Sequence, residues 1–215
     1  MQCKTRQRVL EAACEIFAEK GFRGATLAEI CRKANANIAA ANYYFHDKRS
    51  LYVDAWRHAF ERSLAAHPGD GGVPADAPAE QRLRGRVAST MRRIADPKSH
   101  AFDIVHKEMA TPTGLLAQAM RECLEPLRRD MAGVIRELLG SEVTEQEVQL
   151  CHMSVMAQCF GPLLRERYRK RAPEALRAPD PKWPSTDVET LADHVVRFSL
   201  AGIREARESK RPPAD

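Results

Sequence analysis

The stretch NANIAAANYYFHDK, residues 35–48, carries side chains suited to contacting the bases of a DNA duplex. The carboxamide of Asn42 can pair with adenine through two hydrogen bonds, and alanine methyl groups can pack on thymine methyl groups. Hydroxyl groups and lysine ammonium groups can hold phosphates. The candidate residues for DNA contact are Thr26, Asn37, Ile38, Ala39, Ala40, Asn42, Tyr43, Tyr44 and Lys48.

Two short helices joined by a tight turn must position these side chains. Thr26 followed by Glu29 predicts a capping box at the start of the first helix. Asn35 falls where the chain must turn, and asparagine tolerates the left-handed conformation better than most residues. Asn37 is placed to cap the second helix. The residues expected to lock the two helices together are Ile30, Ala34, Ala36, Ala41 and Tyr44.

This spacing is that of a helix-turn-helix. A tight helical hairpin whose alanines pack internally would show the same local pattern, so residues 26–45 alone leave both interpretations open.

The rest of the chain predicts an all-α fold, because apolar residues recur at helical spacing and no useful β-type alternation is present. A first helix is expected from Thr5 to Lys20, ending at Gly21. Pro126 and the Gly161–Pro162 pair should kink or split two long helices. Further helices are expected at about 48–66, 79–95, 100–110, 114–139, 144–170 and 185–208.

The segment HPGDGGVPADAP, residues 67–78, predicts a loop because glycine and proline dominate it. We expect a DNA-binding domain over residues 1–50 and a larger ligand-binding and dimerisation domain over residues 51–210. The second domain would begin with a connecting helix at 51–66, and residues 211–215 would form a disordered tail.

The charge distribution favours an anionic partner for the N-terminal part. The 215-residue chain has a net charge of +5, and residues 1–66 carry eleven basic and seven acidic side chains, an excess of four. Phosphate contacts need such an excess. No apolar run is long enough to span a membrane and the basic start does not resemble a signal peptide, so we expect a cytoplasmic protein.

Sequence motifs for other chemistry are absent. The histidines show no compact metal-binding spacing, and GxSxG, P-loop and GxGxxG patterns do not occur. We therefore expect no enzyme activity, no metal and no cofactor. The six cysteines are scattered without paired spacing, which favours reduced thiols.

Residues 5–52 resemble the N-terminal domain of TetR-family transcriptional regulators. The matching positions include Leu10, Ala12, Ala13, Phe17, Gly21, Thr26, Ile30, Ala34, Tyr44, Phe45, Lys48 and Leu51. Asn35, Asn37 and Asn42 depart from the glycine, serine and aromatic residue usual in the family, which bears on the operator sequence rather than the fold. The segment ANIAAANYYF is similar to the subgroup typified by CecR (YbiH), as are HKEMATPTG and RRDMAGVIRELLG.

The resemblance implies a homodimeric repressor. Two recognition helices would enter successive major grooves of a palindromic operator on double-stranded DNA, and a small-molecule effector would release the protein. Stripes on the last two long helices suggest the dimer interface, although either stripe could simply be core. The interface would consist of Val148, Cys151, Val155, Cys159, Leu163, Leu191, Val195, Phe198 and Gly202.

Effector pockets in helical proteins are lined mainly by apolar and aromatic side chains, so the effector should be apolar or aromatic. Each candidate residue could equally be plain core. The candidates are Phe102, Val105, His106, Met109, Leu116, Met120, Cys123, Leu127, Met156 and Phe160.

Two other functions stay open from the sequence. Cys151 and Cys159 lie eight residues apart on one helical face and could make a thiol redox sensor, although buried reduced thiols would show the same pattern. The helix-turn-helix could also be the protein-binding surface of an adaptor that binds no DNA.

Overall fold

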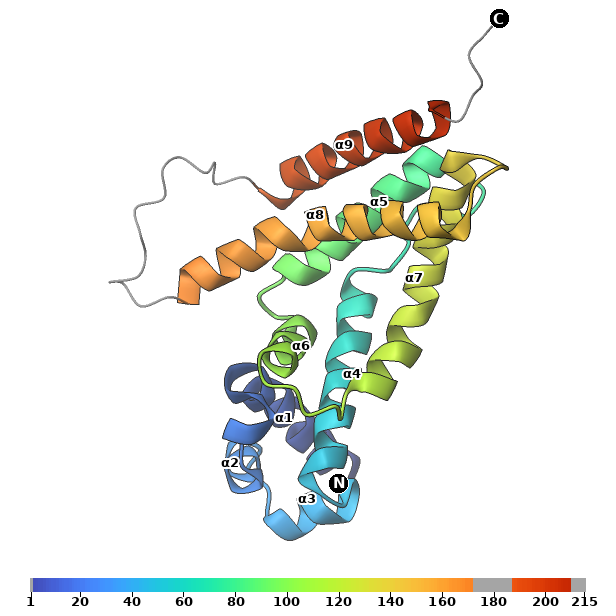
Figure 1. The fold of residues 1–215 in the computed structure, drawn as a ribbon. Coiled ribbons are helices and arrows are strands. Elements are labelled where there is room, and N and C mark those ends of the chain that lie inside the picture. Colours follow the sequence, from blue (N-terminus) through green and yellow to red (C-terminus); the bar gives the residue numbers. More distant parts are fainter. Residues whose placement is uncertain (1, 172–186, 210–215) are drawn as a thin grey trace, which may run out of the picture. The chain divides into compact units, whose positions relative to one another are not determined.

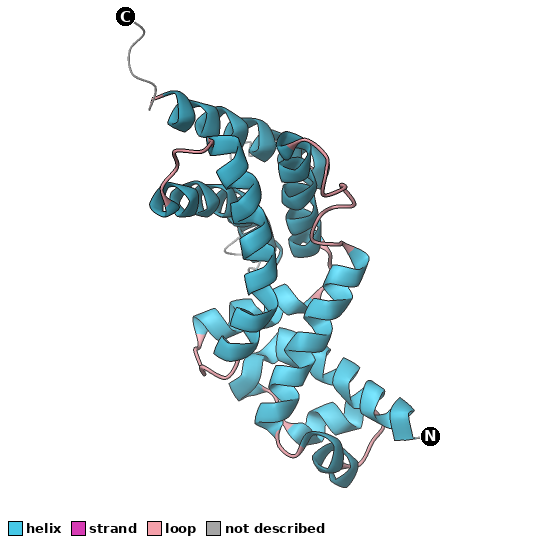
Figure 2. Cartoon of the chain, turned by 90° about the vertical axis from the view of Figure 1, so that its right-hand side faces the viewer, coloured by secondary structure: helices cyan, strands magenta, loops and turns pink. Residues whose placement is uncertain are grey.

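The computed structural model describes residues 2–171 and 187–209, and all regular secondary structure in those ranges is α-helical, as expected (Figures 1 and 2). The predicted tail at 211–215 lies outside the described residues. The helices are α1 (Gln2–Gly24), α2 (Leu27–Lys33), α3 (Ile38–Phe45), α4 (Lys48–Ala66), α5 (Ala79–Ala95), α6 (His100–Ala110), α7 (Ala117–Leu139), α8 (Glu145–Arg171) and α9 (Val188–Glu208).

The first helix ends at Gly21 as predicted, because the φ of 68° and ψ of −179° at this residue are not helical; a kink there separates it from a short helical stretch that runs to Gly24. α7 and α8 continue through Pro126 and Pro162, so neither helix is split there. In α8, Cys159 and Leu163 on either side of Pro162 are both buried. Their packing holds the helix together despite the hydrogen bond that proline removes.

The chain divides into two compact units, each with its own core. Unit 1 comprises residues 1–66 and 96–126, and unit 2 comprises residues 67–95 and 127–215. Residues 51–66 and 96–126 thus pack with the N-terminal helices. This division reflects packing, and the functional division at residue 50 stays a prediction.

Unit 1 is organised around α1, which packs against α2, α3, α4 and α6. Phe17 of α1 contacts Tyr52 of α4 edge to face, with ring centroids 4.8 Å apart. Phe17, Tyr52 and Trp56 are almost completely buried. Each such side chain contributes about 1.5–3 kcal/mol through apolar burial. The helix-turn-helix therefore rests on a rigid base.

Unit 2 contains α5, α8, α9 and the C-terminal part of α7, with α5 packed against both α8 and α9. The loop that follows α4 lies directly on α5, because a Cβ on Gly85 would come within 2.4 Å of the Asp70 carbonyl oxygen. A side chain at this position of α5 would push the loop away, which explains a glycine inside a helix.

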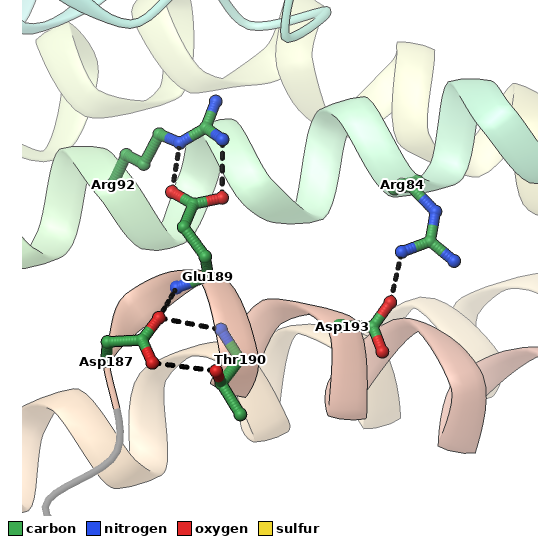
Figure 3. A network of polar contacts seen from close by, with 6 residues as sticks. All are labelled: Arg84, Arg92, Asp187, Glu189, Thr190 and Asp193. Carbon is green, nitrogen blue, oxygen red and sulfur yellow. Dashed lines mark hydrogen bonds and ion pairs between the residues drawn. The ribbon is translucent and has the colours of Figure 1, made fainter.

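Ion pairs join the exposed sides of α5 and α9 (Figure 3). Arg92 donates two hydrogen bonds to the Glu189 carboxylate, at 2.7 and 2.6 Å, and Arg84 pairs with Asp193. Asp187 caps α9 by accepting from the backbone N–H groups of Glu189 and Thr190. Surface pairs contribute about 0–1 kcal/mol each, so these pairs add little to the stability of unit 2. They join the N-terminal part of α9 to α5.

Candidate DNA-binding surface

The first helix of the motif begins with one half of the predicted capping box, because Glu29 pairs with Lys20 instead of the backbone N–H of Thr26. The Thr26 hydroxyl accepts from the backbone N–H of Glu29 at 3.2 Å. The Glu29 carboxylate forms an ion pair with Lys20 of α1 at 2.5 Å. The hydrogen bond to Lys20 holds the pKa of Glu29 below its usual value. This pair fastens α2 to α1, since the two residues come from different helices.

The turn between α2 and α3 is made by two asparagines. Asn35 has φ 47°, the left-handed conformation expected of it. The side-chain oxygen of Asn37 accepts from the backbone N–H of Ala40 at 2.6 Å and caps α3. Arg8 of α1 also donates to the Asn35 carbonyl, at 3.5 Å. Local sequence patterns could not predict this contact, because the two residues are 27 positions apart.

The residues expected to join α2 and α3 do face inward. Ile30, Ala34 and Ala41 are buried, whereas Ala36 and Tyr44 are half-buried. Phe45, which was not in the predicted set, is also buried, and the Arg6 guanidinium lies over its ring, 5.1 Å from the centroid. α3 is therefore fixed along one face only.

The opposite face of α3 is open to solvent. Tyr43 is 73% exposed, Ile38 is 46% exposed, and Ala39 and Asn42 are also exposed. Ala40 is half-buried. Between Ile38 at the N-terminus of α3 and the aromatic ring of Tyr43, the exposed side chains are the small Ala39 and the short Asn42. A helix face of this shape fits closely into a major groove.

The ammonium group of Lys48, which was expected to contact a phosphate, packs against an aromatic ring instead. Its ammonium nitrogen lies 4.4 Å from the centroid of the Phe22 ring, and burial lowers its pKa. Asp47, just before it, caps α4 by accepting from the backbone N–H of Ser50 at 2.8 Å. Reaching a phosphate would require the Lys48 side chain to leave the ring.

The candidate effector residues do not gather in one compact unit. Leu127, Met156 and Phe160 lie in unit 2 and the other seven lie in unit 1. Leu116 is fully buried, whereas Met109 is 74% exposed. The effector pocket stays a prediction.

The candidate dimer residues fall into two groups. Val148, Val155, Cys159, Leu163 and Val195 are buried within a single chain, so they belong to its core and have almost no surface to offer a partner. Phe198 and Gly202 are exposed, and Cys151 and Leu191 are half-buried. Most of the predicted stripe on α8 therefore faces the core of unit 2, and the position of the dimer interface stays a prediction.

The described residues also bear on metal binding, membrane insertion and thiol redox chemistry. In the described ranges no three His, Cys, Asp or Glu side chains come together as a metal site, and no helix there is long and apolar enough to cross a membrane. Cys159 is fully buried, and burial raises its pKa to about 12. A buried, protonated thiol is a poor redox sensor.

Comparison with known proteins identifies the class of protein that this fold and surface define. A model of the TetR family of bacterial regulatory proteins matches residues 9–55. A model of the C-terminal domain of the HTH-type transcriptional dual regulator CecR matches residues 79–203, more than half of the chain. The chain is a TetR-type transcriptional regulator. Within that family it belongs to the CecR-like subgroup, as its sequence predicts.

Curated relatives agree with this assignment. The HTH-type transcriptional regulator SrpR of Pseudomonas putida is 24% identical over 192 residues, which cover 76% of this chain and 86% of SrpR. The HTH-type transcriptional repressor NicS of the same species is 32% identical over 57 residues, covering 26% of this chain and 27% of NicS. Both relatives are named as regulators of transcription.

Solved structures share the fold. A transcriptional regulator from Pseudomonas aeruginosa PAO1 superposes with a TM-score of 0.71 at 18% identity, covering 95% of this chain and 93% of its own. FadR of Bacillus subtilis, in complex with stearoyl-CoA, has a TM-score of 0.69 at 15% identity, covering 92% and 98%.

Proposed function

We propose that the chain is a homodimeric repressor that binds a palindromic operator through α3 and is released from it by a small-molecule effector. The observation that carries the proposal is the solvent-facing side of α3, where Ala39, Asn42 and Tyr43 stand on a helix fixed from behind by Ala41 and Phe45.

Asn42 is the residue proposed to read a base. Its exposed carboxamide lies in the middle of α3, where a donor and an acceptor together can recognise adenine. Tyr43 and the amides at the start of α3 would hold phosphates. The positive excess within residues 1–66 would add non-specific attraction, which makes binding depend on salt.

The dimer would form through an exposed apolar surface that we call the α8–α9 face. It consists of Leu150, Met153, Ala157 and Phe160 of α8 with Phe198, Ala201 and Gly202 of α9. Met153 is 60% exposed and Phe198 is 63% exposed. Their spacing of three or four residues places them in rows along the two helices. The small residues would allow two copies to approach closely as a four-helix contact.

Two-fold symmetry then defines the operator. Two copies of α3 would enter major grooves about one helical turn apart, roughly 34–36 Å. An effector that favours another dimer geometry would change the distance between the two copies of α3, so that they no longer match this spacing. Because the coupling is reciprocal, operator binding would weaken effector binding by the same factor.

Named relatives support the effector and the repressor role. FadR, which shares the fold, was solved with stearoyl-CoA, so this architecture accommodates a ligand that carries a long apolar chain. NicS is named a repressor, and CecR, whose C-terminal domain defines the subgroup, is named a dual regulator. As a regulator of transcription, the protein would act on DNA in the cytoplasm.

Selection of random duplex DNA on the purified protein, followed by a salt titration on the enriched sequence, tests the proposal. We expect a palindrome whose affinity falls steeply as salt increases. Enrichment of an asymmetric site would contradict the two-fold arrangement. No enrichment, with and without reductant, would favour the adaptor alternative over a DNA-binding protein.

A further inference from the structure

The guanidinium group of Arg93, near the C-terminal end of α5, has fewer hydrogen-bond partners than it can bind. Its Nη1 atom is buried and has no hydrogen-bond partner among the described residues. Its Nη2 atom donates to the hydroxyl of Thr90, one turn earlier, at 3.1 Å. A guanidinium carries five N–H groups and a full positive charge, so one hydroxyl leaves most of its binding capacity unused.

The other arginines of α5 have partners in unit 2, and among these described residues no side-chain nitrogen is buried without a hydrogen-bond partner. Arg82 pairs with Glu137, Arg84 with Asp193 and Arg92 with Glu189. Arg86 donates to the carbonyl of Arg82 at 3.2 Å. Arg93 differs from its neighbours because burial, with no opposing carboxylate, lowers its pKa.

The unpaired nitrogen lies near the loop backbone at Gly69, which the Leu127 side chain also contacts. A Cβ on Gly69 would lie 4.0 Å from Nη1 of Arg93 and 2.4 Å from Cδ2 of Leu127. Gly69 belongs to the loop between α4 and α5, and Leu127 belongs to α7. Leu127 is also one of the apolar residues that the sequence suggested for the effector. An apolar side chain and an unpaired cation therefore lie around the same glycine.

Arg93 as a whole is half-buried, but its Nη1 donor is enclosed without an acceptor, and an unsatisfied buried donor is costly. Apolar residues of similar volume commonly replace buried charged groups without loss of stability. An unsatisfied buried group in a native protein therefore calls for an explanation, such as an ion or ligand that is bound in another state. Guanidinium groups bind carboxylates and phosphates through two parallel hydrogen bonds, and Nη1 is free for this purpose.

We propose that Arg93 binds the anionic group, a carboxylate or a phosphate, of the effector, and that the apolar body of the effector lies on the side of Leu127. The proposal about Arg93 rests on the proposed function, because it requires that the protein binds an effector. It adds that this effector carries a negative charge. Binding would displace the Leu127 side chain from Gly69, since that side chain covers the loop next to Nη1.

Thermal unfolding of the full chain with three matched probes tests the proposal. Dodecanoate and dodecyl phosphate offer the two anionic groups on one apolar chain, and dodecanol lacks the charge. Each is added below its micelle-forming concentration to the unchanged protein, to Arg93→Met and to Arg92→Met. Arg92→Met is the matched control, because it removes the arginine directly before Arg93 in α5, which is exposed and paired.

We expect at least one anionic probe to raise the Tm of the unchanged protein by about 2–4 °C more than dodecanol does, at a concentration a few times its Kd. Arg93→Met should abolish this difference, and Arg92→Met should retain it. The ligand-free Tm of Arg93→Met should equal or exceed that of the unchanged protein. A carboxylate-only or phosphate-only response would identify which group the effector carries.

Three results would overturn the proposal: equal shifts with dodecanol and both anions, no shift with any probe, or a difference that survives in Arg93→Met. If Arg93→Met does not fold, Arg93→Gln replaces it with the same expectation for the probes. Operator binding by the same preparations separates this inference from the proposed function. A protein that binds no operator refutes the proposed function whatever the probes do, whereas operator binding without an anion-specific response refutes only the role of Arg93.

Discussion

The hydroxyl of Tyr52 on α4 donates a 3.1 Å hydrogen bond to the carboxylate of Glu108 on α6, joining residues 56 positions apart. The other carboxylate oxygen accepts from the backbone N–H groups of Thr113 and Gly114, at 2.9 and 2.8 Å. Both Tyr52 and Glu108 are buried, and burial raises the pKa of the Tyr52 phenol, which keeps it a donor. This buried carboxylate fixes α4, α6 and the following loop within unit 1.

Removing either side of this contact should destabilise the protein. Tyr52→Phe should cost about 1.5–3 kcal/mol, the contribution of a hydrogen bond to a charged group. Glu108→Ala should cost more, because it leaves the Tyr52 hydroxyl and two backbone donors without an acceptor. Urea unfolding followed by circular dichroism measures both. The exposed Tyr43→Phe is the control and should leave stability unchanged, and equal midpoints for Tyr52→Phe and Tyr43→Phe would contradict the role of the contact.

Asn42→Ala should weaken binding to the selected operator by about 1–3 kcal/mol and relax preference at one base pair. The physical reason is the loss of two hydrogen bonds to one base. Tyr43→Phe provides the comparison, since loss of a phosphate contact should weaken binding to all sequences alike. Titrations on the operator and on single-base variants distinguish the two patterns, and an unchanged preference for Asn42→Ala would show that another residue reads that base.

Met153→Glu should convert the proposed dimer into a monomer, because it would bury a charge in the centre of the α8–α9 face. Operator affinity should fall at least tenfold, since each monomer would contact one half-site. Sedimentation velocity gives the oligomeric state. Met109→Glu makes the same change at an exposed methionine in unit 1 and should leave the dimer intact. Dimeric Met153→Glu would place the interface elsewhere.

Acidification should lower stability in part through His58. Burial, followed by the charge of Arg62, holds the pKa of His58 below its usual value, while Glu11 and Glu61 oppose this shift. Below about pH 6.5 the unfolded chain binds a proton at His58 that the folded chain does not, so the free energy of unfolding falls as pH falls until the folded pKa is passed.

His58→Gln should therefore flatten the decline in urea midpoint between pH 7.5 and pH 5.5. Burial also lowers the pKa of His152, so the double variant with His152→Gln should be flatter still. An identical slope for the unchanged protein and the double variant would rule out this source of acid sensitivity.

The cysteines should react unequally with iodoacetamide at pH 8. Burial raises the pKa values of Cys14 and Cys159 to about 12, so both should stay unmodified in the folded protein. Among the five cysteines whose side chains the structure describes, Cys123 and Cys151 are half-buried and should react before the buried ones. Mass spectrometry of digested protein, with a urea-unfolded sample as control, gives the order. Rapid modification of Cys159 would revive the redox-sensor interpretation.

The sequence by itself determined the helices and the helix-turn-helix. Thr26 and Asn37 cap their helices and Asn35 takes the left-handed conformation, as their types and positions predict. These features follow from hydrogen bonds and steric preferences that reach no more than four residues along the chain. Local chemistry was therefore sufficient to predict them.

Only the tertiary structure decided which apolar residues are buried. α8 carries apolar side chains on more than one face, and packing against α5 and α9 buries Val155 and Cys159 while it leaves Leu150 and Met153 exposed. Periodicity along one helix cannot choose between two apolar faces, because the choice depends on neighbours distant in sequence. The same holds for Tyr52 with Glu108 and for the unpaired Arg93, since a partner, or its absence, is a property of the folded chain.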